Sequence, residues 1–487
     1  MPFEFINNND LDNTTRKRIR SRAALGKNKG KKISRPSRKD LLATATNAVL
    51  RVPLTIGDIS KAKREVERIE RPLDDGLLFP GLLPGEPKGL AKNVILFISS
   101  MGFSSELDGG LDYAGLGTPT CVQFMFVDEA CFHSTMATAL LSFDSLVSKP
   151  YGKMQALRHA SHTFRLVNQK LCSQSAVTDL TIAAVVSMAQ YEYHQKRYQQ
   201  GSAHVQGLWQ IAQLRGGVSN LATNPSGLGQ KVLRVDLEYA LQLGSPTLFR
   251  LEEAKMGCKT VTQFPSVCQK SDHLLHHLDL GQWPYTALSA NCRDLYFDML
   301  YLASLLNSSI SGITPKMNAI ELHQDILLLG YRLVDLRPVG SPLGTSSLQN
   351  KVYLALTSFL MTLLRGWNGR VVQNDLLSQL LLAEVQQTPS AGQDGHETLL
   401  WLLFIGAASS GLWKHPAWVS TTKHVLQGLE DKSWDGVKKI LTGFPWVNSI
   451  HDIAGQELWC HSQDTHSVVT NTISTSETST VARIAIA

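Results

Sequence analysis

Cysteines and histidines, the side chains best suited to binding zinc, occur close together between positions 258 and 277. Cys258 and Cys268 both precede a histidine-rich stretch that contains His273, His276 and His277. Thiolate and imidazole groups are both ligands that zinc accepts. Their spacing fits no standard zinc finger, however, and buried thiols beside surface histidines are the more common arrangement. We therefore predict no metal site and no bound cofactor.

Other patterns that would indicate catalysis each lack an essential part. The stretch DEACFH at 128–133 resembles the acidic box of a nucleotide-driven enzyme, but no glycine-rich phosphate loop precedes it. A His-Glu pair begins at His396, yet Leu400 occupies the position where a zinc protease needs its second histidine. The sequence contains no G-x-S-x-G turn for a nucleophilic serine. We therefore assign no catalytic residue and do not expect an enzyme.

The first 40 residues carry a concentrated positive charge that the rest of the chain lacks. They hold twelve Lys or Arg and four acidic residues, a net charge of +8, whereas residues 41–487 sum to −2. A localised basic arm of this kind binds nucleic acid, a nuclear import receptor or an acidic membrane surface. The side chains that we assign to nuclear import or phosphate contact are Arg16, Lys17, Arg18, Arg20, Arg22, Lys27, Lys29, Lys31, Lys32, Arg35, Arg38 and Lys39.

Three interpretations of this arm stay open. Nuclear import alone is the simplest, and import combined with phosphate contacts would give salt-sensitive DNA binding with little sequence information. An Arg-rich segment is also typical of a mitochondrial presequence, although Asp10 and Asp12 count against it. Because the arm has few apolar residues to bury, we expect it to be disordered when free.

The composition is that of a globular protein with a large buried core. Apolar residues make up 43% of the 487 residues, enough for one large core or several smaller ones. The most apolar window, Leu399–Trp413, is uncharged over 15 residues. A membrane span needs roughly 20 residues, so we predict a buried core helix. The seven cysteines are widely scattered, which favours a reducing compartment.

From about residue 90 to residue 460, apolar residues recur with helical periodicity. Ile182, Val185 and Val186 share one helical face, with Thr178 or Asp179 as the N-cap. A second amphipathic segment at 204–217 stops at its two final glycines, and we expect the pair to form a hairpin closed around Gly201. Further helical segments are expected at Leu295–Leu306, Leu322–Leu336, Val352–Leu364, Val371–Val385, Leu399–Trp413, Val419–Leu429 and Trp434–Leu441.

These patterns predict an all-α fold, an array of antiparallel helices with disordered N- and C-terminal tails. Prolines and glycines cluster before residue 90, and Ser and Thr dominate after residue 460. The expected organisation is a basic arm at 1–40, short helices and a linker at 41–89, one helical regulatory domain at 90–460 and a flexible tail at 461–487.

Six segments carry a family resemblance as a set: FINNND followed by RKRIRSR, FMFVDEACFH at 124–133, HVQGLWQIAQLRGGV at 204–218, VLRVDLEYALQLGSPTLF at 232–249, LLWLLFIGAASSGLW at 399–413 and ILTGFPWVNSIHDIAGQELW at 440–459. Together they resemble the fungal-specific transcription factor family. Its large helical regulatory domain usually follows a binuclear zinc cluster, and this chain is similar to members that lack the cluster.

The most specific group within these segments comprises His204, Gly207, Leu208, Arg215, Gly216, Gly217, Arg234 and Asp236. The resemblance implies a structural role for these residues and no catalytic one. We expect Gly207 to let a neighbouring helix approach, and Gly216 and Gly217 to end their helix. Arg234 and Asp236 are expected to form an ion pair or a capping network.

The resemblance implies a nuclear regulatory or accessory protein whose helical domain senses a partner or a small molecule. Because the zinc cluster is missing, sequence-specific DNA reading is not implied. The expected partners are a nuclear import receptor, DNA contacted non-specifically by the arm, and a protein partner or second copy, with no membrane. The main alternative is a cytoplasmic helical scaffold, and an enzyme with a site near His204 or the histidines around 275 is a further one.

Overall fold

The computed structural model describes Leu83, Glu86 and residues 89–100, 105–114, 119–142, 149–222, 227–258, 287–365, 370–387 and 393–463. All of them belong to one unit, Leu54–Ala487. The basic arm, most of the linker, Cys268, the histidines at 273–277 and the tail after residue 463 lie outside the described residues. What the sequence predicts for those segments stays a prediction.

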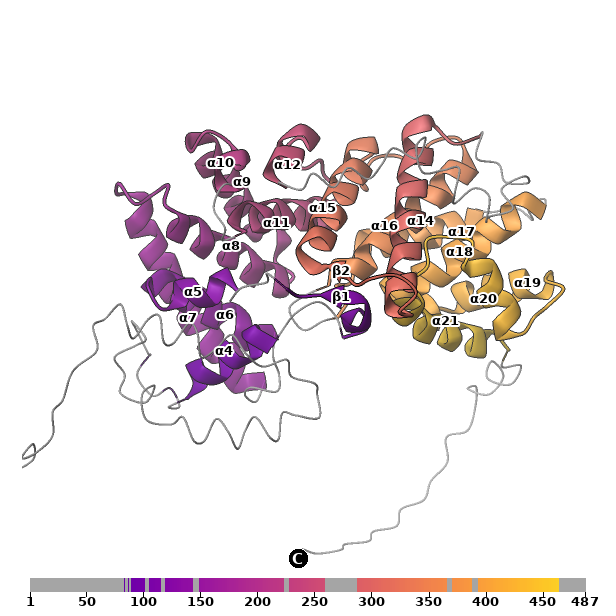
Figure 1. Cartoon of the computed structure of the whole chain (residues 1–487), viewed down its shortest axis with the longest axis horizontal. Helices are drawn as coiled ribbons and strands as arrows, with labels where there is room; N and C mark the ends of the chain where they lie inside the picture. Colours follow the sequence, from indigo (N-terminus) through magenta and orange to yellow (C-terminus); the bar gives the residue numbers. More distant parts are fainter. Residues whose placement is uncertain are drawn as a thin grey trace, which may run out of the picture. The chain divides into compact units, whose positions relative to one another are not determined.

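Seventeen α-helices make up most of the described structure, so the predicted all-α fold class is confirmed (Figure 1). The helices before residue 260 are α4 (Leu90–Ser100), α5 (Thr120–Met125), α6 (Glu129–Ser142), α7 (Lys149–Leu171), α8 (Asp179–His194), α9 (Tyr198–Leu214), α10 (Val218–Ala222), α11 (Leu228–Leu243) and α12 (Leu251–Gly257). Those after it are α14 (Ala290–Ile310), α15 (Ala319–Leu336), α16 (Ser347–Leu363), α17 (Asp375–Gln387), α18 (Gln393–Ser410), α19 (Pro416–Gln427), α20 (Trp434–Leu441) and α21 (Asn448–Gln463).

Local sequence signals place several helix ends. The Thr178 hydroxyl accepts the Thr181 N–H at the start of α8, as predicted, and Ser433 caps α20 in the same way. At the end of α9, Gly217 N–H donates to the carbonyl of residue 212 and Gly216 N–H to that of residue 213, both at 2.9 Å. The φ angle is 86° at Gly216 and 100° at Gly217, and glycine adopts such positive values at the least cost.

The predicted hairpin of α8 and α9 is present, but its turn was placed wrongly. The chain reverses at residues 195–197, where Lys196 has a φ of 57°, and α8 packs against α9. Gly201 instead lies inside α9. A Cβ there would collide with the Tyr239 hydroxyl of α11, which itself donates to the Ala189 carbonyl at 2.7 Å. Gly201 therefore lets α9 approach α11.

Helix α18 lies at the centre of the largest hydrophobic core. Residues 400–405 are fully buried, and the helix packs against α16 and α21. The indole N–H of Trp401 donates to the Pro445 carbonyl at 3.3 Å, so its polar edge is satisfied inside the core. The predicted buried helix is confirmed. Among the helices that the structure describes, none is both long and apolar enough to cross a membrane.

A short parallel ladder joins two segments that are far apart in the sequence. Strand β1 (Leu111–Asp112) pairs with β2 (Met317–Asn318), and Figure 1 shows them side by side. Just before β1 lies the short 3-10 helix η3 (Asp108–Gly110). The Ser309 hydroxyl of α14 donates to the Gly110 carbonyl at 2.7 Å beside this ladder. Two residues per strand are too few to produce an alternating pattern, so the sequence did not predict the pairing.

A second, smaller core surrounds α6. This helix packs against α4, α5, α7 and α8, and twelve of its residues are buried. Phe132 and Met136 lie in this core with Val94 of α4. Because α6 is covered on nearly every side, it also carries polar side chains into the interior, among them His133 and Thr138. These polar side chains need internal partners.

Candidate functional site: a buried histidine–carboxylate cluster

Two buried histidines face each other between α6 and α7. His133 is 1% exposed and His159 is fully buried, and their Nδ1 atoms lie 2.8 Å apart. The Nε2 atom of His159 hydrogen bonds with the Glu86 carboxylate, whose side chain is also fully buried. That carboxylate accepts the Leu83 N–H at 3.0 Å as well. We call Glu86, His133 and His159 the histidine–carboxylate cluster.

The geometry restricts where the protons of the cluster lie. An ionised carboxylate only accepts hydrogen bonds, so His159 carries a hydrogen on Nε2. One proton must also lie between the two Nδ1 atoms. If it belongs to His159, that ring carries hydrogens on both nitrogens and donates in both directions; if it belongs to His133, His159 accepts at Nδ1. The two arrangements differ in which ring holds the proton between the Nδ1 atoms, and neither requires a ring to move.

The outer edge of the cluster approaches the surface of the protein. His133 Nε2 lies 3.7 Å from Glu129 Oε1, one turn earlier on α6, and the Glu129 side chain is 44% exposed. The His133 ring stacks on that of His162, with centroids 5.0 Å apart and planes 27° apart. Arg165 Nη2 lies 3.3 Å from the far side of His162, at Nδ1. The cluster is therefore enclosed at Glu86 and partly open at Glu129.

Burial is the largest single influence on the pKa values of His133 and Glu86, which lie at the two ends of the cluster. Burial, and next the positive charges of His159 and His162, lower the pKa of His133 to about 3. For Glu86, burial raises the pKa, but the hydrogen bond and charge of His159 outweigh it and the pKa is lowered. His133 is therefore neutral and Glu86 ionised at neutral pH. The cluster holds a buried negative charge beside a histidine that resists protonation.

The cluster is not arranged to bind a metal ion. The two imidazoles direct their Nδ1 atoms at each other, and Nε2 of His159 is taken by Glu86. Across the described ranges, no three His, Cys, Asp or Glu side chains gather in a position to hold one. Cys258, one of the residues considered for zinc, is a buried free thiol.

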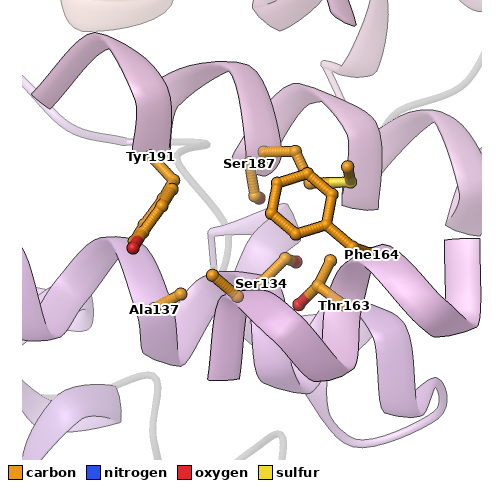
Figure 2. A pocket seen from close by; sticks show the side chains of 8 residues that line it. Ser134, Ala137, Thr163, Phe164, Ser187 and Tyr191 are labelled. Carbon is orange, nitrogen blue, oxygen red and sulfur yellow. The ribbon is translucent and has the colours of Figure 1, made fainter. Parts of the chain in front are cut away.

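A very small void lies next to this part of the interior. Figure 2 shows side chains from α6, α7 and α8 pointing into it, and its volume is about 10 Å³. That is about the space of one water molecule. The hydroxyls of Ser134, Thr163 and Ser187 all donate to carbonyls of their own helices, at 3.0 to 3.1 Å. These three hydroxyls are therefore engaged within their helices, and the void has no room for a substrate.

The acidic stretch at 128–133 contributes helix caps and ion pairs. Asp128 accepts the Cys131 N–H at 2.9 Å at the start of α6. Its other oxygen pairs with Lys170 Nζ of α7 at 2.6 Å. The stretch therefore fastens α6 to α7 at one end, and His133 fastens the same two helices further along.

The family-like residue Arg215 holds two helix ends together. It follows the last residue of α9 and forms an ion pair with Asp179, the first residue of α8. It also donates to the Val177 carbonyl at 3.2 Å. Because Gly216 and Gly217 turn the chain directly afterwards, Arg215 fixes the α8–α9 hairpin at its open end.

Arg234 and Asp236 do not pair with each other, so of the two expected arrangements the ion pair was wrong. Residues two apart on a helix point in different directions. Arg234 Nε pairs with Glu238 at 2.8 Å, and its Nη2 donates to the Arg365 carbonyl at 2.6 Å. Asp236 forms the expected capping network alone: it accepts the N–H groups of residues 248 and 249 at 2.9 to 3.1 Å and the Tyr331 hydroxyl at 2.7 Å. Burial raises its pKa to about 6.

The remaining family-like residues have simple environments. A Cβ at Gly207 would meet nothing within 4 Å, so the expected close approach at Gly207 is wrong and occurs at Gly201 instead. Leu208 is buried in the main core. The ring of His204 lies 5.7 Å from that of Phe164, and burial lowers the pKa of His204.

Sequence reasoning missed the histidine–carboxylate cluster, although part of its signal is visible. Glu129 and His133 are four residues apart, and His159 and His162 are three apart, so each pair shares a helix face. Glu86 has no such signal, because it lies in the Pro- and Gly-rich linker, 73 residues from its partner His159.

We compared the chain with models of known protein families, with curated protein sequences and with solved structures, and none of them matches it.

Proposed function

We propose that this protein is a nuclear regulatory protein similar to fungal-specific transcription factors but without a zinc-cluster DNA reader. In this proposal the arm at 1–40 binds a nuclear import receptor and makes non-specific phosphate contacts with DNA. The helical domain binds a protein partner, a second copy of the chain or a small molecule. No residue is assigned a catalytic role.

The observation that carries this proposal is the concentration of positive charge in the first 40 residues. All of the net positive charge lies in the arm, while residues 41–487 sum to −2. A charge so concentrated serves recognition by an acidic partner rather than solubility of the whole chain. An import receptor and DNA are both partners of that kind.

The helical domain supports a binding role rather than a chemical one. The polar groups of the histidine–carboxylate cluster hydrogen bond with one another inside the domain. The void beside it is about the size of one water molecule. Arg215, Gly216, Gly217 and Asp236 act on helix ends and turns, which is the structural role that the family resemblance implies for them.

The cytoplasmic scaffold remains the alternative, because exposed apolar side chains favour partner binding in either compartment. Leu214, Ile313 and Ile453 are 78%, 79% and 69% exposed, and such residues contribute to protein contacts when they are grouped. The location of the protein in the cell, nuclear or cytoplasmic, distinguishes the regulatory protein from the scaffold.

The test is a fluorescent fusion of the full chain in which Arg16, Lys17, Arg18, Arg20 and Arg22 are replaced with Gln. We expect the parent fusion to be nuclear and the substituted one to move to the cytoplasm. The matched control replaces three exposed lysines of the helical domain, Lys255, Lys432 and Lys439, and should stay nuclear. A parent fusion that is cytoplasmic, or mitochondrial, would contradict the proposal.

A further inference from the structure

Helix α7 carries positive charge at several positions and no negative charge. Its 23 residues include five Lys or Arg and no Asp or Glu. One side of the helix is buried and carries His159, Ala160 and Thr163 into the protein. On the other side, Met154 is 53% and Leu157 is 57% exposed. Two large apolar side chains exposed three residues apart lie together on one helix face, and grouped exposed apolar side chains contribute to protein contacts.

The exposed residues of α7 form one continuous strip. At 100° per residue, positions 154, 157, 161 and 165 follow one face of the helix, and all four are exposed. Lys153 is exposed beside them. We call Lys153, Met154, Leu157, Ser161 and Arg165 the α7 outer face. It places two apolar anchors at one end, a cation beside them and a second cation about 18 Å along the helix.

Among the described residues, no carboxylate pairs with the two cations of this face. Within the described part of the chain, the carboxylates near α7 pair with His159 and Lys170, at the buried side and the end of the helix. No described carboxylate lies within ion-pair distance of Lys153 or Arg165. The Arg165 guanidinium lies 3.3 Å from Nδ1 of His162.

From this arrangement we propose that the α7 outer face docks an acidic amphipathic helix of a partner protein. Such a helix would place Leu or Phe side chains against Met154 and Leu157, and Asp or Glu side chains against Lys153 and Arg165. A helix of about twelve residues matches the 18 Å length of the face. The proposal deepens the partner-binding role proposed above and rests on it.

The apolar anchors favour a protein over nucleic acid. Phosphate binding needs closely spaced cations, and on this face two exposed apolar side chains lie between Lys153 and Arg165. A membrane is also a poor fit, because the opposite side of α7 is packed against α6 and α8, which leaves only a narrow strip to enter lipid. DNA binding at this face is therefore an outcome that would overturn the proposal.

The test uses the full chain with all twelve basic residues of the arm replaced with Gln, so that the arm cannot attract the probe. The probe is a fluorescent peptide of about 16 residues with Leu and Phe at helical spacing and Glu elsewhere. A second peptide has Lys in place of every Glu. We expect saturable anisotropy with the acidic peptide only, weakening as salt rises.

Two α7 variants then locate the site. Met154→Ser with Leu157→Ser, and separately Lys153→Glu with Arg165→Glu, should each weaken binding roughly tenfold. The matched controls are Ile453→Ser for the apolar change and Lys432→Glu with Lys439→Glu for the charge change, and they should bind like the parent. Circular dichroism checks that every variant is folded. Since these substitutions are exposed, loss of folding is not expected.

Three results would overturn the proposal: binding unchanged in both α7 variants, equal binding of the Lys peptide, or preferential binding of duplex DNA that the same variants abolish. Each of them can occur while the fusion protein stays nuclear. Conversely, a cytoplasmic fusion would leave peptide binding intact. Failure of this inference and failure of the proposed function are thus distinguishable.

Discussion

Two buried histidines show how differently the two ends of the helical domain use the same side chain. His451 of α21 accepts the Val447 N–H at Nδ1, at 2.8 Å, and its Nε2 lies 2.8 Å from the Thr362 hydroxyl. That hydroxyl donates to the Phe359 carbonyl at 2.6 Å. His451 therefore has one tautomer, with its hydrogen on Nε2. His133 instead bonds with a second histidine, which bonds with a carboxylate.

His451 belongs to a network of neutral groups, whereas His133 belongs to one that contains the charged Glu86 carboxylate. Burial lowers the pKa of both His133 and His451 to about 3, so both are neutral at pH 7. Removing one partner of His451 leaves a neutral group unpaired, whereas removing His159 leaves the buried charge of Glu86 unpaired. A buried unpaired charge costs far more than a buried unpaired dipole.

The largest effect is expected for His159→Leu. Glu86 then loses the hydrogen bond and charge that offset its burial, and the free energy of unfolding should fall by about 3–5 kcal/mol. The measurement is urea unfolding at pH 7 followed by circular dichroism. The matched control, Glu86→Leu with His159→Leu, removes the charge and should recover much of the loss. A double variant no more stable than the single one would contradict the account.

The next effect is a loss of stability in acid. The folded-state pKa of His133 and of His451 lies below the ordinary value near 6.5, so the unfolded chain binds more protons between pH 6.5 and pH 3. The contribution of each histidine to the free energy of unfolding is therefore fully present above pH 6.5. It falls as the pH drops, by roughly 2 kcal/mol per histidine between pH 7 and pH 5. Glu86, whose pKa is lowered, acts in the same direction at lower pH.

Comparing His451→Gln with the parent isolates one of these contributions. The variant should lose roughly 2 kcal/mol less than the parent between pH 7 and pH 5. Urea midpoints measured at pH 7, 6 and 5 give the two curves. Parallel curves would show that His451 takes up a proton in the folded state as readily as in the unfolded one.

A smaller effect is expected for Thr362→Val, which removes the hydroxyl beside Nε2 of His451. The buried N–H then lacks an acceptor, at a cost of about 1.5 kcal/mol. Thr362→Ser keeps the hydroxyl and should cost less. If the Val variant is as stable as the Ser variant in urea, the tautomer assigned to His451 is wrong.

The smallest effect is expected for Glu129→Gln at the open edge of the cluster. The Glu129 side chain is 44% exposed and its carboxylate lies 3.7 Å from His133, so loss of this charge should change stability by no more than about 0.5 kcal/mol. Thermal unfolding of the variant and parent gives the comparison. A loss approaching that of His159→Leu would place Glu129 inside the charged network.

Much of the fold follows from local sequence signals. The helical periodicity around Ile182, the cap at Thr178 and the stop at Gly216 were all predictable, because each depends on residues a few positions apart. The buried helix at Leu399–Trp413 was predictable from its apolar run. The helix expected from Val371 begins later, at Asp375, because apolar periodicity does not locate a helix start.

The predictions that were wrong all concern contacts between residues far apart in the sequence. The sequence shows a glycine at 201 and another at 207, but only the packing of Tyr239 decides which of them a helix approaches. Arg234 and Asp236 look like an ion pair in the sequence, and their separate partners lie as far away as residue 365. The bond between Glu86 and His159 could not be predicted for the same reason.

The most direct test of the central claim is chromatin occupancy of the tagged full-length protein in its native cells, measured beside its localisation. The account predicts a nuclear protein that a protein partner of the helical domain directs to discrete promoters, because the arm alone contacts DNA non-specifically. Its occupancy there should decline when the five arginines and lysines at 16–22 are replaced with Gln. A protein that is absent from the nucleus, or a nuclear protein with no enrichment above an untagged control, would contradict the claim that it regulates transcription.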